Sequence, residues 1–208
     1  MKIIVTGALG HIGSSLIRYL PKTFPDTRIV LIDSLITQRF SSLFNLPSNG
    51  KFSFYNEDVR EFDFSKVVSD GDVIINLSAI TDAAGSFKNP ELLEKNNYNC
   101  TEKIAYACIK SNARLITISS TSVYGSTKNI VDESSIGDDL NPQSPYAMTK
   151  LMEEDLVRKL YDENGLQAVI LRFGTIFGYS PGMRFHTAVN KFCWQAVLNE
   201  PLTIWETA

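Results

Sequence analysis

The chain has 208 residues, of which 44% are hydrophobic and 21% charged, and its formal net charge is -3 at pH 7. This length and composition suffice for one large domain with a buried core, and they exclude a disordered chain. The slight acidic excess excludes a basic surface of the kind that nucleic acid or an anionic membrane attracts.

The apolar runs along the chain are all short. No run approaches the ~18 apolar residues of a membrane span, and the first, Ile3 to Val5, is too short for the core of a signal peptide. The sequence therefore predicts a soluble protein of the cytoplasm. Cys100, Cys108 and Cys193 lie far from any C-x-x-C spacing, which predicts buried free thiols and no metal site.

Short runs rich in Ile, Val, Leu or Phe alternate with longer segments of helical period. The runs predict buried strands over residues 2–5, 28–32, 52–55, 73–76, 114–119 and 167–172. The longer segments predict helices over residues 12–20, 90–111 and 145–164. This alternation predicts a Rossmann-type α/β fold, a doubly wound parallel sheet with helices on both faces.

The first predicted strand runs into the stretch TGALGHIG, which carries Gly7, Gly10 and Gly13. A strand that turns sharply into a helix needs one glycine for the turn, one where a pyrophosphate approaches the backbone, and one where helix packs on strand. The first amides of the helix, at the positive end of its dipole, would then hold the phosphates. If the three glycines are considered alone, an ordinary tight turn between strand and helix is the alternative to a phosphate-binding role.

The second predicted strand, RIVLID, ends in Asp33, twenty residues after Gly13. A carboxylate at this place accepts hydrogen bonds from the ribose hydroxyls of adenosine, and it repels the 2′-phosphate of NADP. No arginine follows immediately to offset that repulsion, so NAD is the predicted cofactor. A helix N-cap or a turn residue is the alternative for Asp33 alone.

The glycine spacing G-x-x-G-x-x-G resembles that of the short-chain dehydrogenase/reductase superfamily. Further stretches resemble its motifs in the same order: NEDVRE, INLSAITDAAGS, NNYNCTEKI, ITISSTSVYG, SPYAMTK and LRFGTIFG. The resemblance runs from residue 2 to about residue 205. TSVYG and the P-x-S-P-Tyr run resemble the extended branch of NAD-dependent epimerases and dehydratases, which acts on nucleotide sugars.

This resemblance implies a cofactor site drawn from every one of these stretches. Its implied members are Gly7, Gly10, His11, Ile12, Gly13, Asp33, Ser34, Asp58, Val59, Leu77, Ser78, Ala79, Asn99, Ser119, Tyr146, Lys150, Phe173 and Ile176. Cys100 stands where extended members mostly have Gly. The implied substrate contacts are Thr81, Thr121, Ser122, Thr175, Arg184 and Asn190. Arg184 would meet a phosphate or a carboxylate, with a surface ion pair as an equal alternative.

Three residues carry the predicted catalytic chemistry: Ser120, Tyr146 and Lys150. Tyr146 and Lys150 are four residues apart on a predicted helix, so both project from one face. A phenol with a reference pKa of about 10 is a poor base at neutral pH unless a positive charge stabilises its phenolate. The lysine ammonium and oxidised nicotinamide supply that charge. Ser120 can hydrogen-bond the substrate hydroxyl whose proton Tyr146 accepts, and so orient that hydroxyl. By resemblance, Lys150 also binds the nicotinamide ribose.

The kind of reaction is narrowed by two departures from the family patterns. Dehydratases of this branch carry Asp-Glu directly after a catalytic Thr. In this chain Thr121 and Ser122 follow Ser120 instead of Asp-Glu, which disfavours loss of water. Thr175 stands where many UDP-sugar epimerases have Asn, so the sequence does not identify the nucleotide of the substrate. A nucleotide-sugar epimerase is favoured. The alternatives are a sugar or alcohol dehydrogenase/reductase with net hydride transfer, and a non-catalytic NAD-binding sensor or interaction protein.

Two expectations concern domains and assembly. Residues 1–174 are expected to form the NAD-binding domain with the catalytic residues, and residues 175–208 the start of a small substrate-binding lobe, with a strand-like segment, PLTIWETA, at its end. The resemblance implies a homodimer in which helices 90–111 and 145–164 form a four-helix bundle with their partners. The apolar residues Ile104, Ala105, Cys108 and Ile109 fit that interface, and they fit core burial equally well.

Overall fold

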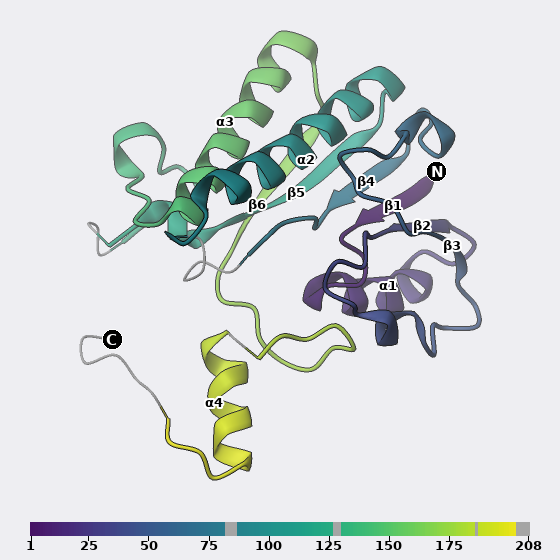
Figure 1. The fold of residues 1–208 in the computed structure, drawn as a ribbon. Helices are drawn as coiled ribbons and strands as arrows, with labels where there is room; N and C mark the ends of the chain where they lie inside the picture. Colours follow the sequence, from purple (N-terminus) through teal and green to yellow (C-terminus); the bar gives the residue numbers. More distant parts are fainter. Residues whose placement is uncertain (82–86, 127–129, 186, 203–208) are drawn as a thin grey trace.

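The structure, a computed structural model, describes residues 1–81, 87–126, 130–185 and 187–202. Its centre is a six-stranded parallel sheet in the order β3-β2-β1-β4-β5-β6 (Figure 1). The strands are β1 (Lys2–Thr6), β2 (Arg28–Ile32), β3 (Lys51–Tyr55), β4 (Val73–Asn76), β5 (Arg114–Ser120) and β6 (Ala168–Phe173). The α-helices are α1 (His11–Thr23), α2 (Pro90–Ser111), α3 (Pro145–Asn164) and α4 (Ala188–Val197).

Helices cover both faces of the sheet. Figure 1 shows α2 and α3 side by side over one face and α1 on the other. The side chains of β1 alternate between these faces: Ile3 and Val5 pack with Ile17 of α1, whereas Ile4 belongs to the cluster that contains residues of α2 and α3. Because both faces are covered, the strands are apolar on both sides, which explains their continuous hydrophobic runs.

Every predicted strand and helix is present, with bounds that differ by three residues or fewer. The largest difference is the end of α1, which was expected at Leu20 but continues through Pro21 to Thr23. Pro21 has no N–H to donate to Ile17, but it lies in the last turn, so the helix loses one hydrogen bond and continues. The strand-like end of the chain, residues 203–208, lies outside the described residues.

The start of α3 is fixed by a local sequence signal. Ser144 is the N-cap, and its hydroxyl accepts a hydrogen bond from the amide of Ala147 at 3.1 Å. Pro145 occupies the first helical position, where its missing N–H costs nothing. Gly165, with φ +68°, ends the helix in the left-handed conformation that glycine favours. Tyr146 therefore stands in the first turn of α3.

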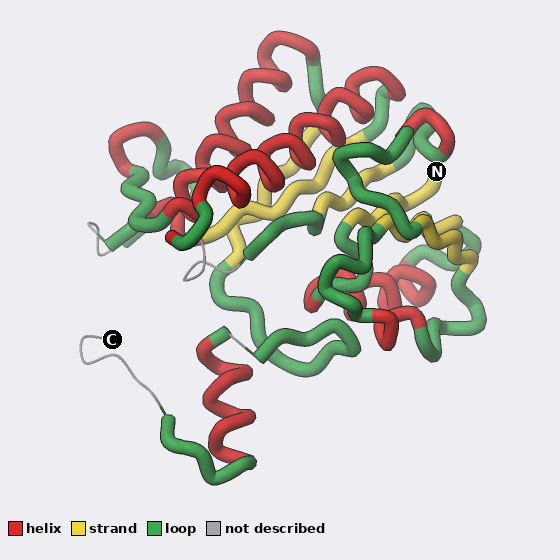
Figure 2. Tube along the Cα trace, viewed as in Figure 1, coloured by secondary structure: helices red, strands yellow, loops and turns green. Residues whose placement is uncertain are grey.

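Helix α4 lies apart from the sheet, beyond a run of loop (Figure 2). This position explains one wrong expectation: Cys100 and Cys108 are buried on α2, but Cys193 on α4 is exposed. Within the described ranges, no helix has the length and apolar character needed to cross a membrane.

A buried ion pair joins α3 to β6. The guanidinium of Arg172 donates to both carboxylate oxygens of Glu154, at 2.9 and 2.7 Å, and Ser119 of β5 donates to the same group at 2.5 Å. Burial by itself raises the pKa of Glu154, but the hydrogen bonds from Arg172 and Ser119 outweigh it and hold that pKa below its usual value. Helix α3 is thereby fixed to β5 and β6.

We predict that Glu154→Gln lowers the free energy of unfolding by about 3 kcal/mol, because it leaves the Arg172 charge buried without a counter-ion. Urea unfolding at neutral pH measures the change. The carboxylate stabilises the fold above its unfolded pKa and stops doing so as the pH falls through its lowered folded pKa, so the difference from wild type shrinks in acid. Asp155→Asn, at an exposed carboxylate on the same helix, is the control and changes stability by about 0.5 kcal/mol or less. Equal effects of the two variants would contradict the prediction.

Candidate active site

A cavity of about 360 Å³ opens at the carboxyl ends of the strands. It lies where the strand order reverses, because β2 and β3 follow on one side of β1, while β4, β5 and β6 lie on the other. Ligands of doubly wound sheets bind at such a switch point, and ligand sites measure roughly 300–1,000 Å³. Figure 2 shows loops gathered at this edge of the sheet, toward α4.

Most of the predicted site residues line this cavity. Those that line it are Gly7, Gly10, His11, Ile12, Gly13, Leu77, Ser78, Ala79, Thr81, Ser119, Ser120, Thr121, Ser122, Tyr146, Lys150, Phe173, Thr175, Ile176 and Arg184. Those that do not are Asp33, Ser34, Asp58, Val59, Asn99 and Asn190. The sequence did not single out Arg39, Asn76, Ile118, Gly174 and Thr187, which also line it.

The glycine-rich turn is packed so closely that two of its positions have no room for a side chain. A Cβ on Gly7, whose φ is +63°, would lie 2.5 Å from the carbonyl oxygen of Leu77. A Cβ on Gly13 would lie 2.5 Å from the carbonyl oxygen of Gly7. The N-cap of α1 is Gly10, which has no side chain to occupy the first amides of the helix. Those amides can therefore bind a phosphate group.

Asp33 is held beside this turn, just outside the cavity lining. Its carboxylate accepts hydrogen bonds from the amide of Leu9 at 3.0 Å and from that of Leu35 at 2.9 Å. Ser34 next to it is exposed. Arg39 lines the cavity near Asp33; burial lowers the pKa of Arg39, and the Asp33 carboxylate opposes that shift. A cation six residues after Asp33 is therefore present, although none follows directly.

Two residues predicted to belong to the cofactor site, Asp58 and Val59, have partners within the protein. Asp58 forms an ion pair with Arg60 at 2.6 Å, and the hydrogen bonds from Arg60 lower the pKa of this carboxyl. Val59 is 5% exposed and packs in the hydrophobic core on the side of α2 and α3. Both follow β3, at the same edge of the sheet as Asp33, but neither lines the cavity.

Asn97, rather than the predicted Asn99, ties α2 to the loop after β4. Asn97 is fully buried, and its amide accepts from the Ile80 N–H at 2.8 Å and donates to the Ile80 carbonyl at 2.9 Å. Asn99 is half-buried and lies away from the cavity. The spacing of the sequence could have identified Asn97. The stretch NNYNCTEKI resembles the family motif N-x-x-G-T, and with Thr101 as the Thr of that motif, its Asn falls at position 97.

The three predicted catalytic residues meet on the side of β5. Ser120 ends β5, and its hydroxyl oxygen accepts hydrogen bonds from the amide and the hydroxyl of Ser122, at 3.1 and 2.8 Å. Tyr146 and Lys150 reach the same cavity from the first turns of α3. Lys150 is 4% exposed, while Tyr146 is half-buried. A phenol, an ammonium and a hydroxyl are thus available around one substrate position, which suits proton transfer to and from an alcohol.

Hydroxyl groups and one arginine, all predicted to contact the substrate, also line the cavity. Thr81, Thr121, Ser122 and Thr175 line it, and Arg184 donates a hydrogen bond to the hydroxyl of Thr81. Asn190, also predicted to contact the substrate, is buried and does not line the cavity. Its amide accepts from the Gly178 N–H at 2.9 Å and donates to the Arg184 carbonyl at 2.8 Å. It therefore shapes the backbone that presents Arg184.

The segment after β6 folds back onto the glycine-rich turn. The Nε2–H of His11 donates to the Gly178 carbonyl at 2.9 Å, and the Gly182 amide donates to the Ser14 hydroxyl at 2.9 Å. A Cβ on Gly182 would lie 2.2 Å from the Leu9 carbonyl oxygen, so this position also requires glycine. Burial lowers the pKa of His11 despite its bond to Gly178, and the charges of Arg184 and Arg39 lower it further. His11 therefore acts as a neutral structural link at pH 7.

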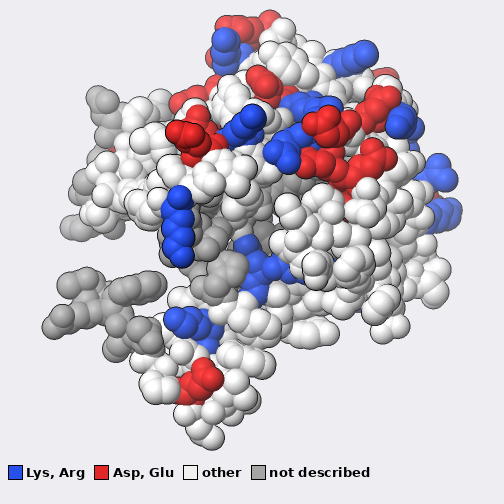
Figure 3. Space-filling model, viewed as in Figure 1, with Lys and Arg blue, Asp and Glu red and all other residues white. Residues whose placement is uncertain are grey.

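Charges of both signs are interspersed over the helices in the face that Figure 3 shows, with a hollow below them that has basic side chains inside. Among the described residues that line the cavity, three carry a positive charge, Arg39, Lys150 and Arg184, and none is Asp or Glu. The described residues also contain no group of three His, Cys, Asp or Glu side chains placed to hold a metal ion. The site is therefore suited to an anionic ligand.

Comparison with known proteins places these features in a family. The model of the NAD dependent epimerase/dehydratase family matches residues 3–208. A curated relative from Bacillus subtilis, the uncharacterized UDP-glucose epimerase YtcB, is 33% identical over 213 residues, which cover 99% of this chain and 65% of the relative. The chain therefore spans about two thirds of the length of that relative.

Solved structures of UDP-sugar epimerases have the same fold. The UDP-glucuronic acid 4-epimerase of Bacillus cereus, in complex with UDP-glucuronic acid and NAD, is 34% identical with a TM-score of 0.89, over 99% of this chain and 66% of that one. The UDP-N-acetylglucosamine 4-epimerase of Methanobrevibacter ruminantium is 29% identical with a TM-score of 0.85, over 98% of this chain and 65% of that one.

We predict that Gly13→Ala weakens NAD binding about tenfold or more, because the new Cβ must displace the Gly7 and Ala8 backbone and with it the amides that face the phosphates. Fluorescence or calorimetric titration with NAD measures this. The control is Gly71→Ala: Gly71 has φ +73° and open space around its Cβ position. That variant is strained by about 1–2 kcal/mol and keeps its NAD affinity. Unchanged binding by Gly13→Ala would contradict the assigned role of the turn.

Proposed function

The chain belongs to the NAD dependent epimerase/dehydratase family, and we propose that it is an epimerase that inverts one hydroxyl-bearing carbon of a nucleotide sugar through a keto-sugar intermediate. The observation that carries this proposal is the meeting of Ser120, Tyr146 and Lys150 with the glycine-rich turn in one cavity. We assign residues 1–174 to cofactor binding and catalysis, and residues 175–208 to the start of the substrate side.

The residues present fit NAD, the cofactor of this family. The turn at Gly7 and Gly13 excludes side chains, Gly10 leaves the first amides of α1 open for the pyrophosphate, and Asp33 stands at the end of β2 for the adenosine ribose. Lys150, which lines the same cavity, would bind the nicotinamide ribose. When bound, NAD supplies the acceptor and donor of a hydride.

The protein's own part in the reaction is to orient the sugar and move one proton. Ser120 donates to the reacting hydroxyl, and Tyr146 takes the proton of that hydroxyl as its carbon becomes a ketone. The Lys150 ammonium stabilises the phenolate of Tyr146 during this step. Tyr146 returns the proton when the ketone is reduced from the opposite face, so the stereochemistry inverts and no NADH is released.

Epimerisation is favoured over dehydration by the chemistry of the cavity lining. Elimination of water needs an acid and a base at neighbouring carbons. After Ser120 this chain has Thr121 and Ser122, and the lining residues that the structure describes include no carboxylate. Hydroxyl groups can bind the sugar, but they are poor proton donors and acceptors at neutral pH. A dehydrogenase/reductase with net hydride transfer and a non-catalytic NAD sensor remain outcomes of the test below.

We propose a UDP-linked sugar acid, with UDP-glucuronic acid first, as the substrate. The Bacillus cereus enzyme that resembles this chain at 34% identity holds UDP-glucuronic acid. In this chain, Arg184 and the hydroxyls of Thr81, Thr121 and Ser122 line the substrate side, and together they can bind a carboxylate without a competing negative charge.

A homodimer through α2 and α3 is also proposed, and for three of the four apolar residues named above the alternative of core burial holds. Ile104, Ala105 and Cys108 are fully buried in the core of the subunit, so they cannot meet a partner. Large apolar side chains that α2 and α3 do expose include Leu92, Tyr106 and Met148. These are the side chains that a bundle of α2 and α3 with their partners would cover.

We predict that Tyr146→Phe lowers turnover by about 100- to 10,000-fold, because it removes the proton acceptor and donor. The full-length protein is incubated with UDP-glucuronic acid, UDP-glucose, UDP-N-acetylglucosamine and dTDP-glucose, while NADH absorbance and product stereochemistry are followed together. Inverted product without NADH, lost in the variant, supports the epimerase.

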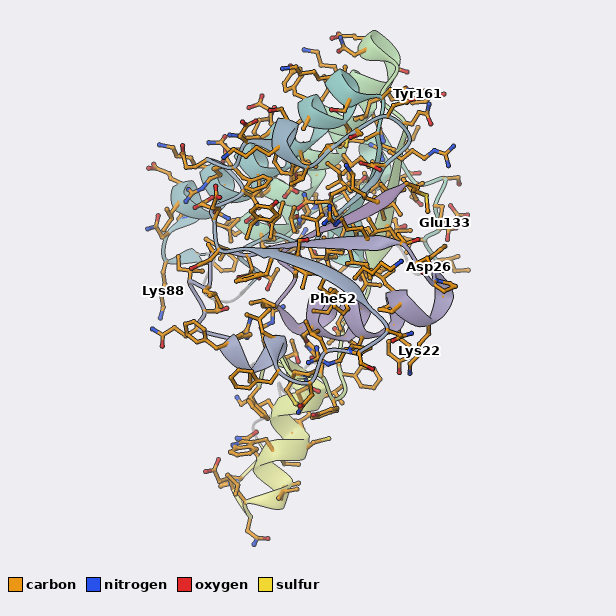
Figure 4. All side chains as sticks on the ribbon, turned by 90° about the vertical axis from the view of Figure 1, so that its right-hand side faces the viewer. Lys22, Asp26, Phe52, Lys88, Glu133 and Tyr161 are labelled. Carbon is orange, nitrogen blue, oxygen red and sulfur yellow. The ribbon has the colours of Figure 1, made fainter. Side chains whose placement is uncertain are left out.

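The matched control is Tyr161→Phe, on the same helix but 63% exposed; Figure 4 shows Tyr161 near the top, at the opposite end of the molecule from α4. It keeps full turnover. Steady NADH release would instead support the dehydrogenase, and tight NAD binding without turnover on any sugar would support the sensor.

We further predict that Arg184→Gln raises KM for UDP-glucuronic acid about tenfold or more while changing KM for UDP-glucose little, because the lost partner is the sugar carboxylate. Steady-state kinetics with both substrates measure the ratio. An equal rise of KM for the two substrates would assign Arg184 to the diphosphate and overturn its role in selecting sugar acids.

A further inference from the structure

Glu153, three residues after Lys150 on α3, has no part in the chemistry assigned so far. Its carboxylate lies 3.1 Å from the Lys150 ammonium, and the two side chains are 4% and 5% exposed, respectively. The geometry points to Glu153 as a positioning residue that keeps Lys150 protonated and directed at its place in the cavity. This inference rests on the proposed function only for the role of Lys150.

Every donor of a buried chain of hydrogen bonds points toward this carboxylate. Thr6 donates to Asn76 at 3.0 Å, Asn76 donates to Thr101 at 3.1 Å, and Thr101 donates to Glu153 at 2.6 Å. Lys150 donates to the same oxygen, Oε2. The chain runs from β1 and β4 through α2 to α3, so Glu153 ties Lys150 to the strands that carry the glycine-rich turn and the cavity wall at Asn76.

Stability alone does not account for a glutamate at this position. Its second oxygen, Oε1, is buried and has no hydrogen-bond partner among the described residues. A buried carboxylate that is only partly satisfied is costly, and an apolar side chain between α2 and α3 is often as stable or more so. We therefore explain this destabilising carboxylate by a functional role. The charged group that it contacts is Lys150, the predicted catalytic lysine.

The electrostatic surroundings of Lys150 single out Glu153. The titratable groups that face Lys150 are Glu153 and Tyr146 on α3 and Cys100 on α2. Burial raises the pKa of Cys100 to about 12, so this thiol is neutral at pH 7. Burial would lower the pKa of Lys150, but the negative charge of Glu153, the oxygen of Tyr146 and the hydrogen bond to Glu153 raise it. Removing Glu153 would take away two of the contributions that oppose the effect of burial on this pKa.

This role has a consequence for the catalytic cycle. A buried lysine that loses its proton can neither stabilise the phenolate of Tyr146 nor donate two charge-assisted hydrogen bonds to a ribose. Binding of a positively charged nicotinamide next to an isolated ammonium would favour that loss. Glu153 counters it, because its charge is fixed within the protein and is present before the cofactor arrives.

The test is a pH titration of Lys150 in the cofactor-free protein, followed through the carbon-13 signal of its Cε, which Lys150→Met assigns. In wild type, we expect the midpoint above the ordinary lysine value of about 10.4. In Glu153→Gln it moves to lower pH, and in Glu153→Asp, which retains the charge, it returns toward wild type. Asp155→Asn, at an exposed carboxylate of the same helix, leaves it unchanged.

NAD binding gives a second readout. At a pH where Lys150 of Glu153→Gln has lost its proton, NAD binds about tenfold more weakly than to wild type, since a charge-assisted hydrogen bond is lost. An unchanged Lys150 midpoint in Glu153→Gln overturns the inference. If that variant does not fold, a wild-type midpoint below the ordinary lysine value overturns it equally. Neither measurement contains a sugar, so an enzyme that is inactive on all sugars would refute the proposed function and leave this inference standing.

Discussion

The close approach of backbone to backbone at the glycine-rich turn is the constraint on which the rest of the site depends. Gly7 lies against the Leu77 carbonyl at the end of β4, and Gly13 lies against the Gly7 carbonyl, with no space for a Cβ at either place. This packing brings the start of α1 next to the ends of β1 and β4. The cavity lies there, at the place where the strand order also reverses. A side chain at either position would separate the phosphate-binding amides from the catalytic strand end.

Helix α3 is held by two adjacent buried carboxylates that face different neighbours. Glu154 binds Arg172 and Ser119 of the sheet, while Glu153 binds Thr101 of α2 and Lys150 of its own helix. Adjacent helix residues point about 100° apart, so one pair of positions fixes both the distance of α3 from the sheet and its rotation. Rotation matters most for Tyr146 and Lys150, whose use depends on a shared direction. The ion pair of Glu154 with Arg172 fixes the position of α3 on the sheet, and the ion pair of Glu153 with Lys150 stabilises the positive charge of the lysine.

What the sequence predicted is what local pattern encodes. The apolar runs, Ser144-Pro145 at the start of α3 and the spacing of Gly7, Gly10 and Gly13 depend on neighbouring residues, and the structure contains them all. What it missed depends on tertiary contacts, whether their partners are near or far in the sequence. Asn190 uses its amide for the backbone of Gly178 and Arg184, and Gly182 packs on the turn at Leu9, far away in the sequence. No pattern in a single chain reveals such pairings. Asn97 is different, because counting back from Thr101 would have found it.

The distribution of charge divides recognition between two kinds of groups. The chain as a whole is negative, at -3, yet the described charged residues that line the cavity are Arg39, Lys150 and Arg184. A cleft of one sign with low-dielectric walls concentrates ligands of the other sign, and both a dinucleotide and a sugar nucleotide carry a diphosphate. Positive charge thus attracts both ligands, and it can tell a sugar acid from a neutral sugar but not one neutral sugar from another. That distinction falls to groups with direction, the hydroxyls of Thr81, Thr121, Ser122 and Thr175, because a hydrogen bond depends on angle as well as distance.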